Sequence, residues 1–279
     1  SHVLERFFNQ IIEEVGDPRM DISLKERKRA YLKINYKSEQ QQKDADNRAD
    51  IRINPLGSGS DYTPFLQHLG IASANISFGG EVSDGSYHTL YDTYEHYTTW
   101  RDPGLIYGVS LAQVAGRATL RLANSERLPF EFKGFADNID LYVNELEDLA
   151  DTMREDISKQ NSWIIDGTYA AVLDPTKTIV PPKTKDSVPH FNFSPLKNAL
   201  ARLMDSAVDF EDSVNMNKQT TEEVNNLLYT VERLMVRDEG LPGRGWCFTG
   251  VRSLRPLRVR TEPKEPQIRI RRRPENPPF

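Results

Sequence analysis

The sequence has little cysteine and no long apolar run. Cys247 is the single cysteine, so no disulfide can form within the chain. No run of eighteen apolar residues occurs, which is the length that a membrane-spanning helix needs. The chain begins with Ser1 inside a helical pattern. We therefore expect the natural N-terminus to lie further upstream, and the lack of a signal or anchor is uninformative.

Charge is distributed unevenly along the 279 residues. Residues 244–279 contain ten Lys/Arg against three Asp/Glu, a net charge of +7. The whole chain has a net charge of −5, so residues 1–243 have a net charge of −12. An acidic body argues against general nucleic-acid binding, so we expect no specific nucleic-acid partner. Six prolines and the positive charge of residues 247–279 predict a disordered basic tail.

The first 130 residues mix helix and strand signals. Apolar residues from Val3 to Val15 recur at helical spacing, and 23–50 is predicted to be a short helix followed by a solvated insertion. Strands are expected at 51–53 and 71–78, an aromatic-rich loop at 81–100, and helices at 61–69 and 102–124. The last of these is apolar nearly all round, which predicts a buried helix. This order favours the edge of an α/β fold.

Beyond Leu128–Phe132 the strand signals almost vanish. Apolar residues step by three and four along three stretches, within 139–157, 196–210 and 224–235. Three amphipathic helices predict a helical bundle, with a long loop over 172–190. The expected organisation is an α/β part at 1–130, an α-helical bundle at 131–246 and the tail at 247–279.

Two segments contain residue types suited to a binding site. Gly57-Ser58-Gly59-Ser60-Asp61-Tyr62 places a glycine-flanked polar turn before a predicted helix, where backbone can approach a ligand closely. Tyr87-His88-Thr89-Leu90-Tyr91-Asp92-Thr93-Tyr94-Glu95 places a histidine in a loop among aromatic residues. Taken alone, the first segment is a helix-capping turn and the second holds a histidine bonded to its neighbours.

Together the two segments resemble the zinc peptidases of the glutamate carboxypeptidase II and transferrin receptor superfamily. The resemblance implies that His88 is a zinc ligand through a neutral imidazole nitrogen. It also implies that Ser58 and Gly59 line the substrate pocket and that Ser60 borders the neighbouring pocket. Tyr87 corresponds to a tyrosine that helps to bind the C-terminal side of the substrate.

The family's complete site holds two zinc ions bridged by an aspartate and a water, with a glutamate as general base. By resemblance, this chain supplies one ligand, His88, and lacks the bridging aspartate, the base and the remaining ligands. The resemblance therefore implies the C-terminal part of a zinc exopeptidase that acts on peptides, inactive as this chain alone. Full-length members are single-pass membrane proteins with the peptidase domain outside the cytosol.

The helical part resembles the dimerisation domain of the same family, which implies a homodimer formed through these helices. Leu241-Pro242-Gly243-Arg244-Gly245-Trp246 matches a late segment of that domain, and the resemblance stops there. Two alternatives remain open: a non-catalytic, receptor-like interaction module, and a truncated product that folds poorly. Retention of His88 and of the Ser58–Asp61 turn favours descent from an active peptidase.

Overall fold

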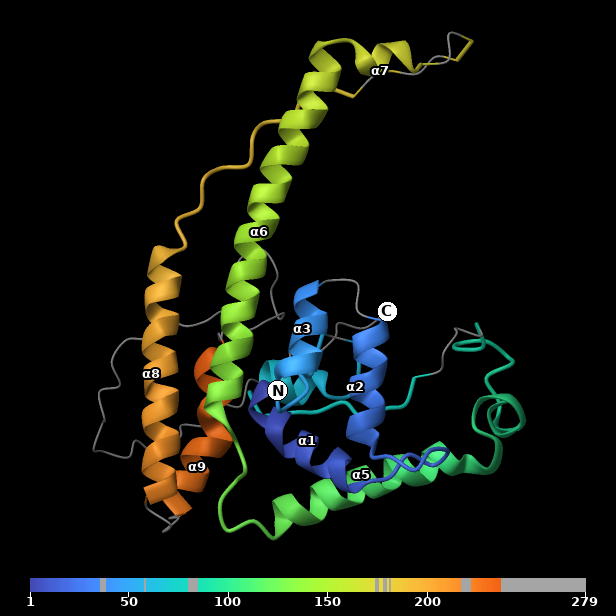
Figure 1. The fold of residues 1–279 in the computed structure, drawn as a ribbon, viewed down its shortest axis with the longest axis vertical. Coiled ribbons are helices and arrows are strands. Elements are labelled where there is room, and N and C mark those ends of the chain that lie inside the picture. Colours follow the sequence, from blue (N-terminus) through green and yellow to red (C-terminus); the bar gives the residue numbers. More distant parts are fainter. Residues whose placement is uncertain are drawn as a thin grey trace, which may run out of the picture.

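A computed structural model describes residues 1–35, 39–57, 59–79, 85–173, 176–177, 180, 182–216 and 222–236, which form helices joined by loops (Figure 1). The α-helices are α1 Glu5–Glu14, α2 Leu24–Asn35, α3 Glu39–Asn47, α4 Tyr94–His96, α5 Ile106–Ala123, α6 Phe132–Ile165, α7 Thr168–Ala171, α8 Ser194–Met216 and α9 Glu222–Thr230. The shorter turns of helix are η1 His2–Leu4, η2 Pro64–His68, η3 Tyr97–Arg101, η4 Pro103–Leu105 and η5 Val231–Met235. In this part of the chain no helix is both long and apolar enough to cross a membrane.

The α/β fold class predicted from the sequence is wrong. The residues that the structure describes contain no strand and no sheet; the one β-bridge is isolated and joins Gly16 to Ser23. Residues 51–53 and 71–78, where strands were expected, have no regular secondary structure. The described chain is all-α.

The segment at 51–53 fails to form a strand because side chains take the place of a neighbouring strand. The side-chain amide of Asn9 donates to the Ile51 carbonyl at 2.9 Å and accepts from the Ile51 amide at 2.8 Å. The Ile53 amide donates to the Glu5 carboxylate at 3.1 Å. Alternation of apolar residues indicates that one face of the segment is buried. A strand also needs a neighbouring backbone with which to form hydrogen bonds.

Within 23–50 the predicted short helix is α2, and the segment predicted as a solvated insertion contains the helix α3, in which Ala45 is buried. The packed pair α2–α3 buries a small cluster of Leu32, Ala45 and Ile51. Helix α2 begins with a capping box: the Glu26 amide donates to Ser23 Oγ at 3.1 Å, and Glu26 Oε2 accepts from the Ser23 amide at 2.7 Å.

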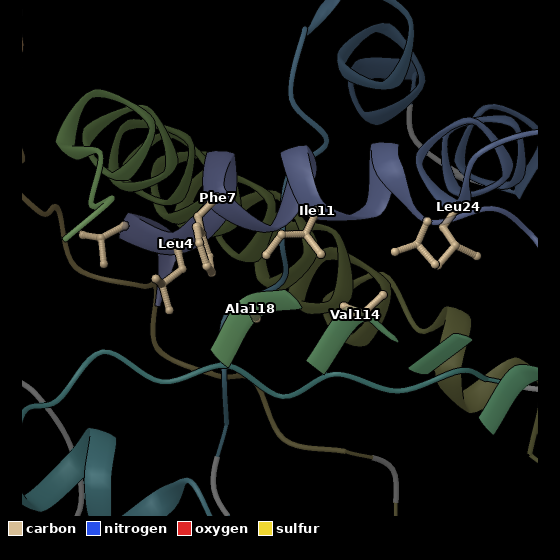
Figure 2. Packing of buried hydrophobic residues seen from close by; sticks show 8 residues of the cluster. Leu4, Phe7, Ile11, Leu24, Val114 and Ala118 are labelled. Carbon is tan, nitrogen blue, oxygen red and sulfur yellow. The ribbon is translucent and has the colours of Figure 1, made fainter. Parts of the chain in front are cut away.

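The main core lies where α1 crosses α5 (Figure 2). Helical spacing places Leu4, Phe7 and Ile11 on one face of η1 and α1, as the sequence predicts. They pack with Val114 and Ala118 of α5. The remaining buried members of this core are Val3, Val15 and Leu24.

Helix α5 begins at Ile106, after the start at Asp102-Pro103 that the sequence predicts, because Gly104 and Leu105 have positive φ values and interrupt the helix. It is also not buried all round. The carboxylate of Asp102 accepts hydrogen bonds from the Tyr107 and Gly108 amides at 3.1 and 2.8 Å, which satisfies the start of the helix. Val109 and Leu120 are 56% and 64% exposed. The expectation of a fully buried helix therefore fails on the face turned away from α1.

The long helix α6 organises the second half of the molecule (Figure 1). Helix α8 packs along it, and residues 182–193 return beside its far half. Arg154 of α6 donates to the Pro189 carbonyl at 2.8 Å, and Asn161 exchanges two hydrogen bonds with the main chain of Lys185. The three predicted bundle helices thus correspond to α6, α8 and α9 with η5.

The last described residues, in η5, contact the first residues of the chain and the segment after η2. Ser1 Oγ donates to the buried carboxylate of Glu232 at 2.9 Å, and Arg233 donates to the Leu69 carbonyl at 2.9 Å. Gly70 has a φ of +60°, and a Cβ there would lie 2.6 Å from the Arg233 Cα. Only glycine fits this contact without a shift of the backbone.

Some sequence predictions concern residues outside the described ranges. These are Ser58, the segment Leu241–Trp246 and the tail at 247–279. The boundaries at 130 and 246 are likewise still predictions.

The Asn9 side chain gives a first testable prediction. Asn9→Leu leaves the Ile51 amide and carbonyl buried without partners, which should lower the free energy of unfolding by about 2–4 kcal/mol. Chemical denaturation measures the change. Asn144→Ala, at an exposed residue of α6, is the control and should cost less than about 0.5 kcal/mol. Equal stability of the two variants would contradict the proposed role of Asn9.

Candidate functional site

The glycine-rich turn is held by a threonine that follows it. Thr63 Oγ1 accepts hydrogen bonds from the Gly59 and Ser60 amides at 3.2 and 3.4 Å. Gly59 has a φ of +91°, and the buried Gln67 side chain donates to the Gly57 carbonyl at 2.7 Å. Gly59 and Ser60 are exposed. The turn is therefore exposed, with the Gly59 and Ser60 amides bonded to Thr63.

His88, the predicted zinc ligand, lies on an exposed loop. Its φ is +61°, which is unusual for a residue other than glycine. Its ring stacks on that of Tyr87 with centroids 3.7 Å apart. Tyr87 is 69% exposed, so both residues face solvent together. The structure thus brings together the predicted metal ligand and one predicted substrate-binding residue.

The structure does not bring the turn and His88 into one site. Residues 85–101, which we call the arm, extend away from the α1–α3 cluster (Figure 1). Within the described chain, the arm's helices α4 and η3 contact only each other and η4. Among the described elements, the helices of the arm therefore do not pack on η2, which follows the turn.

One histidine does not make a metal centre. Across the described ranges, no group of three or more His, Cys, Asp or Glu side chains is placed to hold one ion. Zinc in proteins requires three or four such ligands. The residues present therefore do not fit the two-zinc site that the resemblance implies.

A buried polar network that sequence reasoning missed lies at the start of α1. Glu5 is 2% exposed, and its carboxylate accepts from Arg48 at 2.9 Å and from Asn138 of α6 at 3.1 Å. Burial raises the pKa of Glu5, while its hydrogen bonds and the charge of Arg48 act in the opposite direction. A glutamate within an amphipathic helix carries no sequence signal that distinguishes it from a solvated one.

Next to this network, His2 contacts Tyr142 of α6. The His2 Nε2 atom and the Tyr142 hydroxyl are 2.9 Å apart. Burial lowers the pKa of His2 from 6.5 to about 4, and the positive charges of the amino terminus and Arg52 act in the same direction. Burial also raises the pKa of Tyr142 to about 12. Both rings are therefore neutral at physiological pH.

Tyr142 also lines a groove of about 840 Å³ between α6 and the segment that follows α3. Its walls come from α2, α3, residues 51–55 and one face of α6. Acidic side chains on its rim are Asp44, Asp137, Asp140, Glu145 and Asp148. This α6 groove is separate from the turn and from the arm.

The chain is similar to several curated peptidases. Over 199 residues it is 27% identical to Probable glutamate carboxypeptidase VP8 of Zea mays, covering 70% of this chain and 24% of that protein. The chain is homologous to part of the glutamate carboxypeptidases. Probable glutamate carboxypeptidase LAMP1 of Arabidopsis thaliana is 35% identical over 91 residues, which are 33% of this chain and 13% of that protein.

Aminopeptidase NAALADL1 of Mus musculus is 30% identical over 115 residues, covering 39% of this chain and 15% of that protein. No family model matches the chain. The chain thus spans about a quarter or less of the length of these glutamate carboxypeptidase-like relatives. Its relationship to peptidases is established, as the resemblance in the two sequence segments predicted.

The His2 environment predicts a pH-dependent stability. Between pH 6.5 and about 4 the unfolded chain binds a proton at His2 that the folded chain does not. The contribution of His2 to the free energy of unfolding should therefore be complete above pH 6.5. It should fall as the pH drops towards 4, by at most about 3 kcal/mol. Denaturant titrations at each pH should show that His2→Gln loses this component.

The wild type and His2→Gln are compared at each pH by the difference between their free energies of unfolding. Contributions of Glu5 and Glu232, whose pKa values burial raises, have the opposite sign and cancel in that difference. His190→Gln, at an exposed residue, controls for loss of an imidazole. Parallel pH curves for the wild type and His2→Gln would contradict the prediction.

Proposed function

We propose that this chain is the C-terminal part of a zinc-dependent, carboxypeptidase-like exopeptidase that removes C-terminal residues from peptides in the complete protein. The observation that carries the proposal is the similarity to glutamate carboxypeptidases over 70% of the chain. The exposed pair Tyr87–His88 supports it, because a ligand and a substrate contact must both face the bound substrate. In the complete site, zinc supplies Lewis acidity and activates water.

Within this proposal, His88 holds zinc through one imidazole nitrogen. Ser58 and Gly59 line the substrate pocket, Ser60 borders the next pocket, and Tyr87 contacts the C-terminal side of the peptide. Gly59 and Ser60 are exposed, so a peptide can approach the turn, whose amides Thr63 holds in place. The other ligands and the general base come from sequence outside this chain, so the chain alone is inactive.

This proposal predicts that the purified chain does not hydrolyse peptides, with or without added zinc. A single imidazole cannot retain a pair of zinc ions. Hydrolysis of dipeptides and short acidic peptides should stay at the rate of the buffer. His96→Ala, at the last residue of α4, serves as the control for His88→Ala. Turnover that His88→Ala abolishes and His96→Ala leaves intact would overturn the proposal of inactivity.

A second candidate function is a receptor-like dimerisation module, and a stripe on α6 favours it. Leu146, Leu149 and Met153 lie on one face at helical spacing and are 50%, 54% and 45% exposed. Three exposed apolar side chains in a row are typical of a surface that a partner covers. We propose that the helical part forms a homodimer through this stripe.

Self-association of the chain should therefore depend on the α6 stripe. At tens of micromolar, by order of magnitude, sedimentation should show dimers, since a small interface binds in the micromolar range. Leu149→Lys with Met153→Lys should shift the chain to monomer. Leu120→Lys on α5, at a leucine that is 64% exposed, should not. A monomeric wild type, or the same effect from both changes, would contradict this dimer.

A further inference from the structure

Residues 51–54, which we call the edge segment, lie beside α1. The Ile51 amide and carbonyl bond the Asn9 side chain, and the Ile53 amide bonds the Glu5 carboxylate. Residues four apart on a helix are about 6 Å apart along its axis, and residues two apart in a strand are separated by about 6.6 Å. The spacing of Glu5 and Asn9 therefore matches that of two residues in an extended chain whose main-chain groups point to the same side.

The other side of the edge segment is an open edge. In an extended chain, successive residues point their amide and carbonyl groups to opposite sides. The main-chain groups of Arg52 and Asn54 therefore point away from α1. Within the described ranges these groups make no hydrogen bond. An edge of unpaired amides and carbonyls is a template on which a further strand can form.

This open edge borders the α6 groove. All four residues of the edge segment line the groove. The α2–α3 wall contributes Leu32 and Ala45, which belong to the same apolar cluster as Ile51. The volume of about 840 Å³ leaves room for an extended peptide beside the edge segment. The groove thus offers such a peptide both hydrogen bonds and an apolar contact.

The α6 wall of the groove is acidic. Asp140, Glu145 and Asp148 are exposed and have no ion pair in the part of the chain that the structure describes. Arg52, the basic side chain among the lining residues, already pairs with Asp44 at 2.7 Å. Three carboxylates therefore remain for the arginine or lysine side chains of a ligand. Charge complementarity selects a basic occupant.

The spacing of the carboxylates fits an extended basic peptide. Asp140 and Asp148 are eight residues apart on α6, which is about 12 Å along the helix axis. Residues four apart in a strand are about 13 Å apart and point to the same face. A peptide that lies along α6 can therefore pair both aspartates through basic residues at its positions i and i+4. Residues at the intervening positions point to the other face, where aliphatic side chains suit the apolar contact.

We propose that the α6 groove binds an extended segment of a partner protein in which aliphatic and basic residues alternate. The segment forms a strand on the open edge and bonds the main chain of Arg52 and Asn54. Its basic side chains pair with the three carboxylates of α6, and its aliphatic side chains pack against Leu32 and Ala45. This inference is independent of the proposed peptidase function.

A synthetic peptide of alternating arginine and valine tests the pattern. It should bind the full chain at submillimolar concentration, and its affinity should fall as salt is added. A peptide of the same composition with all its arginines in one block should bind about fivefold more weakly, because its charges no longer match the spacing on α6. Equal binding of the two peptides would overturn the proposal.

Two pairs of substitutions with the same change in net charge test the location. Asp140→Asn with Asp148→Asn should weaken binding of the alternating peptide by about fivefold, because two ion pairs are lost. Asp205→Asn with Asp209→Asn, at exposed carboxylates of α8, is the matched control and should change the affinity by less than about twofold. The same loss in both variants would show non-specific attraction to an acidic surface and would contradict the proposed site.

Amide hydrogen exchange, read residue by residue, tests the added strand. With the peptide at about ten times its dissociation constant, exchange at Arg52 and Asn54 should slow by about tenfold. Exchange at Ile51 and Ile53, whose amides already bond α1, should not change. Unchanged exchange at Arg52 and Asn54 would overturn the proposal. So would protection of these two amides in the free chain, which would show that the chain itself or a second copy already covers the edge.

Discussion

The buried carboxylate of Glu5 is the constraint on which the arrangement of the helices depends. One side chain joins three parts of the chain: α1, residues 51–53 through the Ile53 amide, and α6 through Asn138. A charge in this environment is costly unless every oxygen is paired. Arg48 supplies the opposite charge, and it reaches Asp137 on α6 as well. The network therefore fixes where α6 begins relative to the core between α1 and α5.

The same network explains why an α/β pattern yields an all-α structure. Glu5 and Asn9 use side-chain atoms to satisfy one edge of residues 51–53, as a neighbouring strand would. Hydrophobic alternation specifies the buried face of such a segment, whereas a sheet requires a second backbone alongside it. Within the described residues that second backbone is lacking, so the segment packs as an irregular chain against helices, with Ile51 buried beside Leu32 and Ala45.

Local signals were predictable from the sequence, and long-range ones were not. The helical period identified α1, α5, α6, α8 and α9, because each period is set by neighbours within a few residues. The turn before η2 and the loop position of His88 were local as well. The Glu5 network, the His2–Tyr142 contact and the α6 groove join residues that are far apart in the chain, and no spacing encodes them. The resemblance identified the peptidase relationship, which periodicity could not.

The length of α6 has a mechanical consequence. A helix of 34 residues is about 51 Å long, so a tilt of about 5° at its base displaces its far end by about 4 Å. The hydrogen bonds from Arg154 and Asn161 to residues 185–189 act as a brace along this lever. These bonds oppose such a displacement, because they join the distal half of α6 to residues 185–189. The position of the distal half of α6 thus depends both on the bond between Asn138 and Glu5 near its base and on the bonds to residues 185–189.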